Sequence, residues 1–300
     1  MRFVTVEAAD RRVPGLLLGE PANGHLRVLD LAKVCGVADL VDFIAAGPAA
    51  LATARAASGK AEAALTLPTG ALRAPIPRPR RNVFCVGRNY IDHIAEGDRT
   101  RGIQTPLPQH PQFFTKPPST VIGPGANIET EAAISTKIDY EIELAVVIGR
   151  RGRNLQAADA MGIVFGYTIG NDVTARDMQR RHDQWFKGKG LDTFCPLGPW
   201  IVAHETIGDP QALNLSLSVN GQMRQSSNTS SMLFRIDRII AELSQGMTLE
   251  PGDIILTGTP PGVGYAMDPP QFLKPGDAVE CRIDGIGVLA NNVLERRPGV

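Results

Sequence analysis

Short apolar runs separated by glycine and proline dominate the chain beyond about residue 82. We predict strands for six of these runs, at residues 83–86, 140–148, 163–169, 213–219, 253–256 and 278–283. The dipeptides Asn220-Gly221 and Asp284-Gly285 lie between apolar runs and favour tight hairpin turns, which predicts antiparallel pairing. Helical patterns interrupt the strands at residues 174–182 and 234–244, without the regular alternation of a doubly wound sheet. The pattern predicts a β-rich α+β fold.

The first part of the chain has a different composition. Residues 1–72 combine strand-like runs at 2–6, 13–18 and 26–31 with an alanine-rich, helix-favouring stretch at 37–57. Prolines then recur in residues 73–82 and favour extended backbone, which is typical of a linker. We therefore predict a small N-terminal α+β domain (1–72), a Pro/Arg-rich linker (73–82) and a metal-dependent catalytic domain (83–300).

Composition narrows the class of protein. The 31 lysines and arginines balance 31 aspartates and glutamates, and no basic stretch is interleaved with aromatic residues, which argues against nucleic acid as a partner. The N-terminus reaches charged residues before any long apolar run, so we expect a cytoplasmic protein without a membrane partner. Its four cysteines form no C-x-x-C pair and are predicted to be reduced, mostly buried thiols.

Three acidic residues stand out against apolar surroundings. Glu141 and Glu143 interrupt the apolar run at 140–148, and alternate residues of a strand share one face, so their carboxylates are predicted to lie side by side. A solvated strand face is the alternative, but burying two like charges without a counterion is costly. Asp172 follows the run at 163–169, where an aspartate alone would suggest a helix N-cap. Three carboxylates without histidine or cysteine suit Mg²⁺ or Mn²⁺.

Cationic and amide side chains follow these acids along the chain. Arg176 and Gln179 are three residues apart on the predicted helix and therefore share a face, from which they can hold a substrate carboxylate. Lys189 lies between two glycines, where backbone can approach a ligand closely. Taken singly, each of the three is typical of a solvated surface residue.

Two further motifs suggest acid–base and oxyanion chemistry. His93 and Glu96 have helical i, i+3 spacing, and a histidine held by a carboxylate can act as a general base. Glycines at 87 and 97 flank them and permit a mobile lid. Thr259 belongs to a Gly/Pro loop after an apolar strand, which can offer donors to an oxyanion or be only a turn.

Five motifs follow one another along the chain, and their order indicates a protein family more specifically than any single motif does. They are Gly87-Arg88-Asn89-Tyr90 with His93 and Glu96, Asp139-Tyr140-Glu141-Ile142-Glu143-Leu144, the run 170–179, Lys189 ahead of 192–199, and Thr257-Gly258-Thr259-Pro260. Together they resemble the fumarylacetoacetate hydrolase family, including acylpyruvases and 2-hydroxyhepta-2,4-diene-1,7-dioate isomerases, over residues 80–295. The resemblance implies a mixed β-roll catalytic domain of that family's C-terminal type and a homodimer.

The resemblance also implies site residues in three groups. The ligands of Mg²⁺ or Mn²⁺ would be Glu141, Glu143 and Asp172. The catalytic residues would be the lid dyad His93 and Glu96, and Lys189. The substrate-binding residues would be Arg88, Arg176, Gln179 and Thr259. A polar, Pro-rich stretch at 98–111 is longer than is usual in the family and is expected to shape the distal pocket.

Three functions remain open on this basis. The leading interpretation is hydrolysis of a C–C bond in a 2,4-diketo acid, acylpyruvate or fumarylpyruvate-like, giving pyruvate and a carboxylic acid. An oxaloacetate decarboxylase, or an isomerase or decarboxylase of 2-oxo-dienoic diacids in aromatic catabolism, would use the same stabilised enolate. The third is a metal- or keto-acid-binding protein without turnover, since a fold alone does not settle function.

Overall fold

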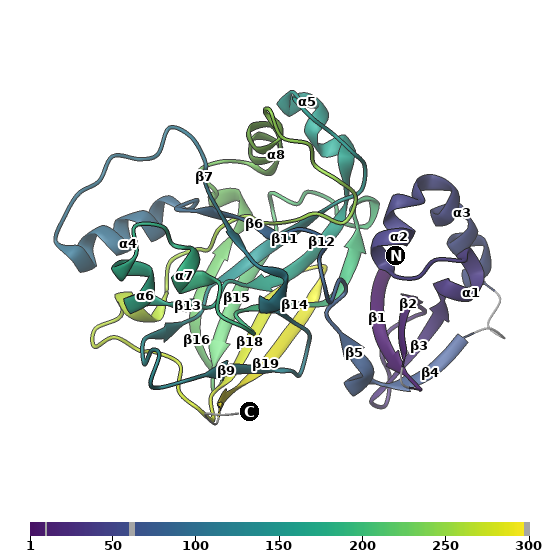
Figure 1. Cartoon of the computed structure of the whole chain (residues 1–300), viewed down its shortest axis with the longest axis horizontal. Coiled ribbons are helices and arrows are strands. Elements are labelled where there is room, and N and C mark those ends of the chain that lie inside the picture. The colour runs from purple at the N-terminus through teal and green to yellow at the C-terminus, as the bar shows by residue number, and fades with distance from the viewer. Residues whose placement is uncertain (10, 60–63, 297–300) are drawn as a thin grey trace.

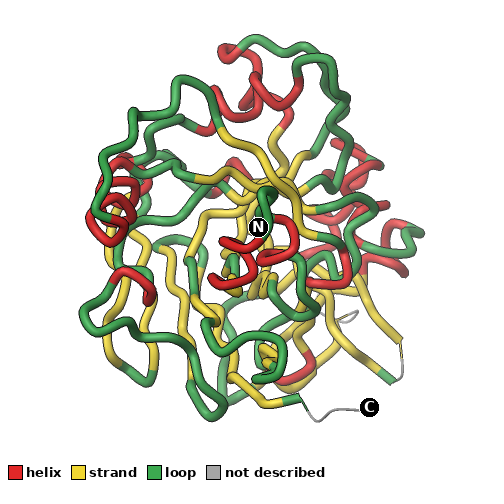
Figure 2. Tube along the Cα trace, turned by 60° about the vertical axis from the view of Figure 1, so that its left-hand side comes forward, coloured by secondary structure: helices red, strands yellow, loops and turns green. Residues whose placement is uncertain are grey.

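The computed structural model describes residues 1–9, 11–59 and 64–296. Residues 10 and 60–63 of the predicted N-terminal domain, and 297–300 of the predicted catalytic domain, lie outside the described residues. Strands run through the body of the molecule, while helices lie mainly over its outside (Figure 2). In the described part of the chain, no helix is both long enough and apolar enough to span a bilayer.

An antiparallel meander covered by three helices forms the N-terminal part (Figure 1). Its strands are β1 (Arg2–Ala8), β2 (Arg11–Leu17), β3 (His25–Asp30) and β4 (Ala64–Pro68). Its helices are α1 (Leu31–Cys35), α2 (Leu40–Ala45) and α3 (Gly47–Ser58). The three predicted strands are confirmed, whereas the predicted helical stretch is divided because Gly47 has a left-handed backbone, with φ of 68°.

The main sheet continues from this meander into the rest of the chain. Its order is β4-β3-β2-β1-β14-β12-β11-β17-β6-β7, and short β5 and β8 pair with β1 and β14. The added strands are β5 (Leu72–Arg73), β6 (Val83–Gly87), β7 (Gln112–Lys116), β8 (Val121–Ile122), β11 (Ile142–Ile148), β12 (Val164–Asn171), β14 (Cys195–Ala203) and β17 (Ile254–Leu256). Because β1 pairs with β14, the two predicted domains share a sheet. Their division stays a prediction.

A second sheet of five strands packs beside the first, in the order β16-β15-β18-β19-β9. Its strands are β9 (Asn127–Thr130), β15 (Asn214–Val219), β16 (Gln222–Asn228), β18 (Ala278–Ile283) and β19 (Gly287–Glu295). The strict alternation of buried and exposed residues along β18 shows that only one face of this sheet is covered. Asn220 and Gly221 have positive φ and join β15 to β16, which confirms the predicted hairpin turn.

Helices and short pairings complete the fold. The helices are α4 (Ile91–Arg101), α5 (Ala157–Ala160), α6 (Arg176–Arg181), α7 (Phe186–Lys189) and α8 (Ile236–Ser244). The 3₁₀ turns are η2 (Thr69–Ala71), η3 (Pro118–Thr120), η4 (Met161–Ile163), η5 (His204–Thr206), η6 (Thr229–Ser231) and η7 (Gly264–Ala266). The helix predicted at 174–182 starts later, at Arg176, because Thr174–Ala175 forms strand β13 and pairs with β10 (Ile138–Asp139). The β-rich α+β prediction is confirmed.

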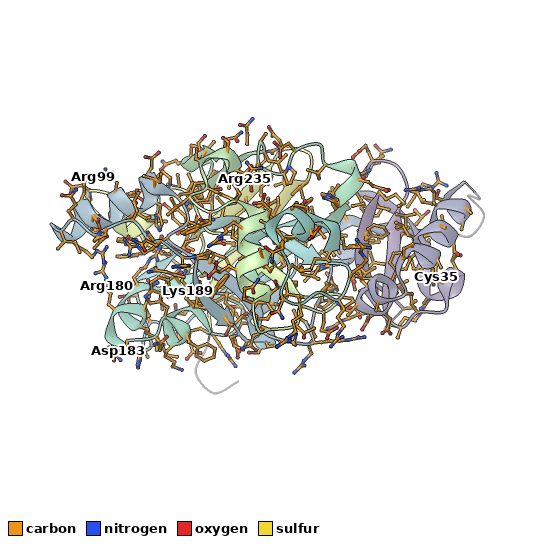
Figure 3. All side chains as sticks on the ribbon, turned by 90° about the horizontal axis from the view of Figure 1, so that it is seen from above. Cys35, Arg99, Arg180, Asp183, Lys189 and Arg235 are labelled. Atoms are coloured by element: carbon orange, nitrogen blue, oxygen red, sulfur yellow. The ribbon has the colours of Figure 1, made fainter. Side chains whose placement is uncertain are left out.

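The centre of the main sheet is fully buried. Every residue of β11 is buried, so the centre of the main sheet is covered on both faces. The labelled residues Arg99, Arg180 and Asp183 lie at one end of the molecule, and Cys35 of the N-terminal part lies at the other (Figure 3). Cys85, Cys195 and Cys281 are buried, Cys35 is half-buried and all are free, as predicted.

Candidate metal centre and its pocket

The three predicted acids converge where β11 begins and β12 ends. Glu141 lies between β10 and β11, Glu143 lies within β11, and Asp172 follows β12. Each offers an oxygen within 4.8 Å of the others, and all three are buried. The predicted strand at 140–148 starts only at Ile142, so Glu143 lies within the strand and Glu141 immediately before it. The two carboxylates nevertheless lie close together, as predicted.

Hydrogen bonds hold Glu141 beside the end of β12. The Asp172 N–H donates to the Glu141 carbonyl at 2.8 Å, and the Glu141 N–H donates to Oδ1 of Asn171 at 3.0 Å. The ends of β11 and β12 are thereby tied together, which holds two of the acids against each other. The N-cap alternative for Asp172 is wrong, because Ala175 occupies the cap position of α6.

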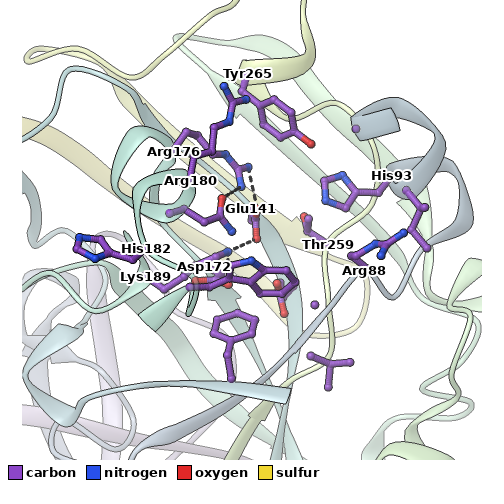
Figure 4. Close-up of a pocket in the computed structure, with 18 of the residues that line it drawn as sticks. Arg88, His93, Glu141, Asp172, Arg176, Arg180, His182, Lys189, Thr259 and Tyr265 are labelled. Atoms are coloured by element: carbon purple, nitrogen blue, oxygen red, sulfur yellow. Dashed lines mark hydrogen bonds and ion pairs between the residues drawn. The ribbon is translucent and has the colours of Figure 1, made fainter. Parts of the chain in front are cut away.

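Two buried lysines and an arginine surround the acids. Nζ of Lys189 lies 2.8 Å from Oε2 of Glu141 and 2.6 Å from Oδ2 of Asp172 (Figure 4). Nη2 of Arg176 forms an ion pair with Oε1 of Glu141 at 2.8 Å, at an angle outside that of a directed hydrogen bond. Nζ of Lys116 lies 2.5 Å from Oδ1 of Asp172. Lys116 was not predicted, because it is an isolated lysine at the end of β7.

The electrostatics of this cluster leave one carboxylate without a cationic partner. Burial raises the pKa of Glu141, but Lys189 and Arg176 outweigh it and lower the pKa to about 2. For Glu143 the same burial, with Asp172 and Glu141 close by, raises the pKa well above 4.5. Glu143 accepts a hydrogen bond from the Gly258 N–H at 2.6 Å. A divalent cation would supply the missing charge.

The donor set fits such a cation. Three carboxylates supply only oxygen ligands, which Mg²⁺ and Mn²⁺ prefer. Seven buried charged groups make up the cluster, and their formal charges (four negative, three positive) sum to −1: Asp139, Glu141, Glu143, Asp172, Lys116, Arg176 and Lys189. Adding a charge of +2 gives +1, which suits an anionic ligand.

The predicted lid dyad faces this centre from α4. Nδ1 of His93 lies 3.3 Å from Oε2 of Glu96, and both side chains are largely buried. Oε1 of Glu96 accepts from the Gly262 N–H at 2.9 Å, which ties α4 to the loop after β17. In Figure 4 the imidazole of His93 points into the pocket from the side opposite Lys189.

Asp139 connects that loop to Arg176. Its Oδ2 accepts from Nε of Arg176 at 2.8 Å and from the Tyr265 N–H at 3.0 Å, while its Oδ1 accepts from the Gly264 N–H at 2.7 Å. The Tyr265 ring lies against the Arg176 guanidinium, 4.5 Å from ring centroid to Cζ. No role was predicted for Asp139 or Tyr265. Asp139 is the first residue of the motif at 139–144, whereas Tyr265 reaches the pocket only because the loop after β17 folds back to it.

The remaining predicted residues also line the pocket, with their own protein partners. Thr259 donates its hydroxyl proton to the Ile142 carbonyl at 2.9 Å and accepts from Gln225 at 2.8 Å. Its proton is therefore already used within the protein. Oε1 of Gln179 accepts from Arg176 at 3.2 Å. Nη2 of Arg88 donates to the Thr105 hydroxyl at 2.5 Å. The functional roles of these residues stay predictions.

The pocket itself has a volume of about 540 Å³ and contains all the predicted site residues except Glu96 among its lining. Additional lining comes from basic side chains that the sequence analysis did not single out, Arg101, Arg180 and His182. Phe114 and Trp185 pack edge to face, 5.6 Å between centroids, and form an apolar wall. The pocket therefore joins an acidic cluster, whose oxygens could hold a cation, to a group of basic side chains.

Comparison with known proteins places this arrangement in a family. The profile of the fumarylacetoacetate hydrolase C-terminal family matches residues 82–294. The chain belongs to the fumarylacetoacetate hydrolase family. The predicted resemblance and the family's fold are therefore confirmed.

Members of the fumarylacetoacetate hydrolase family similar to this chain carry several activities. The oxaloacetate tautomerase YisK of Bacillus subtilis (strain 168) is 42% identical and covers 98% of this chain and 100% of its own. The crystal structure of 2-hydroxyhepta-2,4-diene-1,7-dioate isomerase from Mycobacterium marinum is 34% identical, with a TM-score of 0.76 and 99% of both chains covered. Maleylpyruvate hydrolase from Sphingobium sp. SYK-6, in complex with manganese(II) and pyruvate, is 28% identical, with a TM-score of 0.79 and 99% and 100% covered.

Proposed function

We propose that this chain is a divalent-metal-dependent enzyme that interconverts the enol and keto forms of oxaloacetate or a closely similar 2-oxo dicarboxylic acid. The observation that carries the proposal is the buried acid trio, in a chain 42% identical over its length to an oxaloacetate tautomerase. Of the functions predicted from the sequence, this is nearest to the oxaloacetate alternative. It differs in keeping the C–C bond, because only protons move.

The acids Glu141, Glu143 and Asp172 would hold the cation. When bound, a divalent cation supplies Lewis-acid stabilisation of the negative charge on the 2-oxo oxygen. Lys189 and Arg176 add fixed positive charge beside Glu141, where the substrate's oxygens would lie.

In the enol-to-keto direction the enol oxygen gives its proton to water and C3 gains a proton. Nδ1 of His93 faces Glu96, so Nε2 is the nitrogen that delivers the proton to C3, and His93 recovers a proton from water. Glu96 is held in turn by the Gly262 N–H, so the dyad keeps its orientation. The aromatic wall of Phe114 and Trp185 limits access of water from one side.

Hydrolysis of a 2,4-diketo acid is the second candidate. A histidine held by a carboxylate can also activate water, and a related structure is a maleylpyruvate hydrolase. This leading prediction from the sequence is less well supported by the comparisons than an oxaloacetate activity. Two other predicted functions, decarboxylation and binding without turnover, also stay predictions. The same holds for the identity of the native ion, the homodimer and the cytoplasmic location.

A side-by-side assay separates these reactions. With Mg²⁺ or Mn²⁺, the full chain should accelerate the loss of enol oxaloacetate absorbance above the buffer rate, without releasing CO₂. An acylpyruvate tested in parallel should release no second acid at a comparable rate. Acid release that is faster than tautomerisation would favour hydrolysis, and CO₂ release would favour decarboxylation.

The role of His93 has its own test. His93→Ala should lower the tautomerisation rate by about 10²- to 10⁴-fold, the usual contribution of general acid–base catalysis. His110→Ala is the matched control, because His110 is exposed and contacts Glu242 at the surface. Equal rates for both variants would remove His93 from the mechanism.

A further inference from the structure

The segment after α4 is fastened to that helix by one buried carboxylate. Gly102 ends α4 with a left-handed backbone, and the following residues turn back along it. Oδ2 of Asp98 accepts from the Thr105 N–H at 2.7 Å, and the Asp98 carbonyl accepts from the Ile103 N–H at 3.1 Å. Asp98 is only 7% exposed. We name Asp98 and Thr105 the clasp.

The clasp also holds two arginines that line the pocket. Nη2 of Arg101 donates to Oδ1 of Asp98 at 2.8 Å. The Thr105 hydroxyl lies 2.9 Å from Oδ2 of Asp98, to which it donates, and accepts from Nη2 of Arg88 at 2.5 Å. One carboxylate therefore orients Arg101 directly and Arg88 through a hydroxyl. Both arginines belong to the pocket that contains the acid trio.

Charge and position indicate what the arginines bind. Two guanidinium groups and one carboxylate leave a formal charge of +1 on this wall of the pocket. In Figure 4, Arg88 lies on the His93 side, across the pocket from Lys189. Arg180 adds a further guanidinium to the lining and lies 5.5 Å from the Tyr265 ring centroid. A planar guanidinium is suited to a carboxylate.

We propose that Asp98 and Thr105 are positioning residues that orient Arg88 and Arg101 to bind the second carboxylate of a dicarboxylic 2-oxo acid. This inference rests on the proposed function for the placement of the 2-oxo acid head at the acid trio. It adds the reason for selecting a dicarboxylate over a monocarboxylate. The selective element lies in the stretch at 98–111 that the sequence analysis expected to shape the distal pocket.

Pyruvate and oxaloacetate are matched probes, because they differ by one carboxylate. Their dissociation constants for the Mn²⁺-loaded full chain are measured by titration calorimetry, with fresh oxaloacetate and a parallel assay for pyruvate formed during the run. Thr105→Val removes the hydroxyl relay at nearly constant volume and should weaken oxaloacetate binding about tenfold while changing pyruvate binding less than about twofold. Thr105→Ser should restore the wild-type preference.

Two further variants complete the test. Arg88→Met should lower the preference for oxaloacetate over pyruvate at least as much as Thr105→Val does. If Thr105→Val fails to fold, Arg88→Met provides the test in its place. Thr100→Val is the control, because the Thr100 hydroxyl is exposed and contacts only the Glu96 carbonyl of its own helix. Equal weakening of both probes would show that the clasp has a structural role only, and an unchanged preference in Arg88→Met would also overturn the proposal.

Failure of this inference is distinguishable from failure of the proposed function, because binding does not require turnover. A chain that prefers oxaloacetate through the clasp but does not tautomerise it would overturn only the proposed function. A chain that tautomerises oxaloacetate while Thr105→Val retains the full preference would overturn only the inference.

Discussion

Lys116 offers the sharpest test of how the acid cluster is balanced. Its ammonium group is fully buried and lies 2.5 Å from Oδ1 of Asp172 and 3.1 Å from the Val173 carbonyl. Lys116→Met keeps most of the side-chain volume and removes the charge. Breaking a buried ion pair costs about 3–5 kcal/mol, and Asp172 retains Lys189 at 2.6 Å, so we expect the lower end, about 3 kcal/mol.

The loss of stability in Lys116→Met should be measurable by thermal unfolding, and its size should depend on whether a divalent cation is bound. About 3 kcal/mol corresponds to a fall in Tm of roughly 5 °C in a chain of 300 residues, because the entropy of unfolding is about 2 cal/mol/K per residue. Without Lys116 the formal charge of the seven-group cluster changes from −1 to −2, so a bound divalent cation should recover part of the loss. Thermal unfolding is therefore measured in EDTA and in saturating Mn²⁺, and the deficit in Tm should be smaller with Mn²⁺.

The control is Lys187→Met, because Lys187 is exposed and lies two residues from Lys189. A surface change of this kind should stay within about 0.5 kcal/mol. The reasoning is refuted if Lys116→Met unfolds at the control's temperature in EDTA, or if Mn²⁺ leaves its deficit unchanged.

The remaining predictions concern protons and packing. Because the folded chain raises the pKa of Glu143 well above 4.5, stability in EDTA should fall as pH rises above that value, and Mn²⁺ binding should release protons into weak buffer. The pKa of Glu141 shifts in the opposite direction, to about 2, so its contribution to stability is lost only as pH falls below about 4.5. Absence of proton release on Mn²⁺ binding at about pH 5 would contradict the raised pKa of Glu143. Gly188→Ala should displace α7 and lower activity, because its Cβ would lie 2.5 Å from the Gln179 backbone nitrogen, whereas Gly208→Ala has open space and should match wild type.

Much of the fold and most of the candidate site could be predicted from local sequence patterns. Hairpin turns, strands and the i, i+3 spacing of His93 and Glu96 depend on neighbours in the sequence, and the structure has them in the predicted places. The three acids were recognisable because carboxylates interrupt or directly follow apolar runs, where burial demands a counterion.

Residues whose roles depend on distant partners escaped prediction. Lys116 reaches Asp172 across 56 positions, and nothing around it in the sequence distinguishes it from a solvated lysine. Tyr265 enters the pocket because Asp139 binds its backbone N–H from 126 positions away. The position of Glu141 likewise depends on Asn171, which accepts a hydrogen bond from its backbone N–H from 30 positions away. Long-range contacts of this kind have no periodic signature.

The central claim is that Glu141, Glu143 and Asp172 hold one divalent cation that the reaction requires. The most direct measurement is titration of the EDTA-treated chain with Mn²⁺, monitored by calorimetry and by the rate of enol oxaloacetate loss in the same samples. We predict one site per chain, activity that returns in proportion to its occupancy, and loss of both in Glu143→Gln. Full activity in excess EDTA, or activity that does not follow occupancy, would contradict the account.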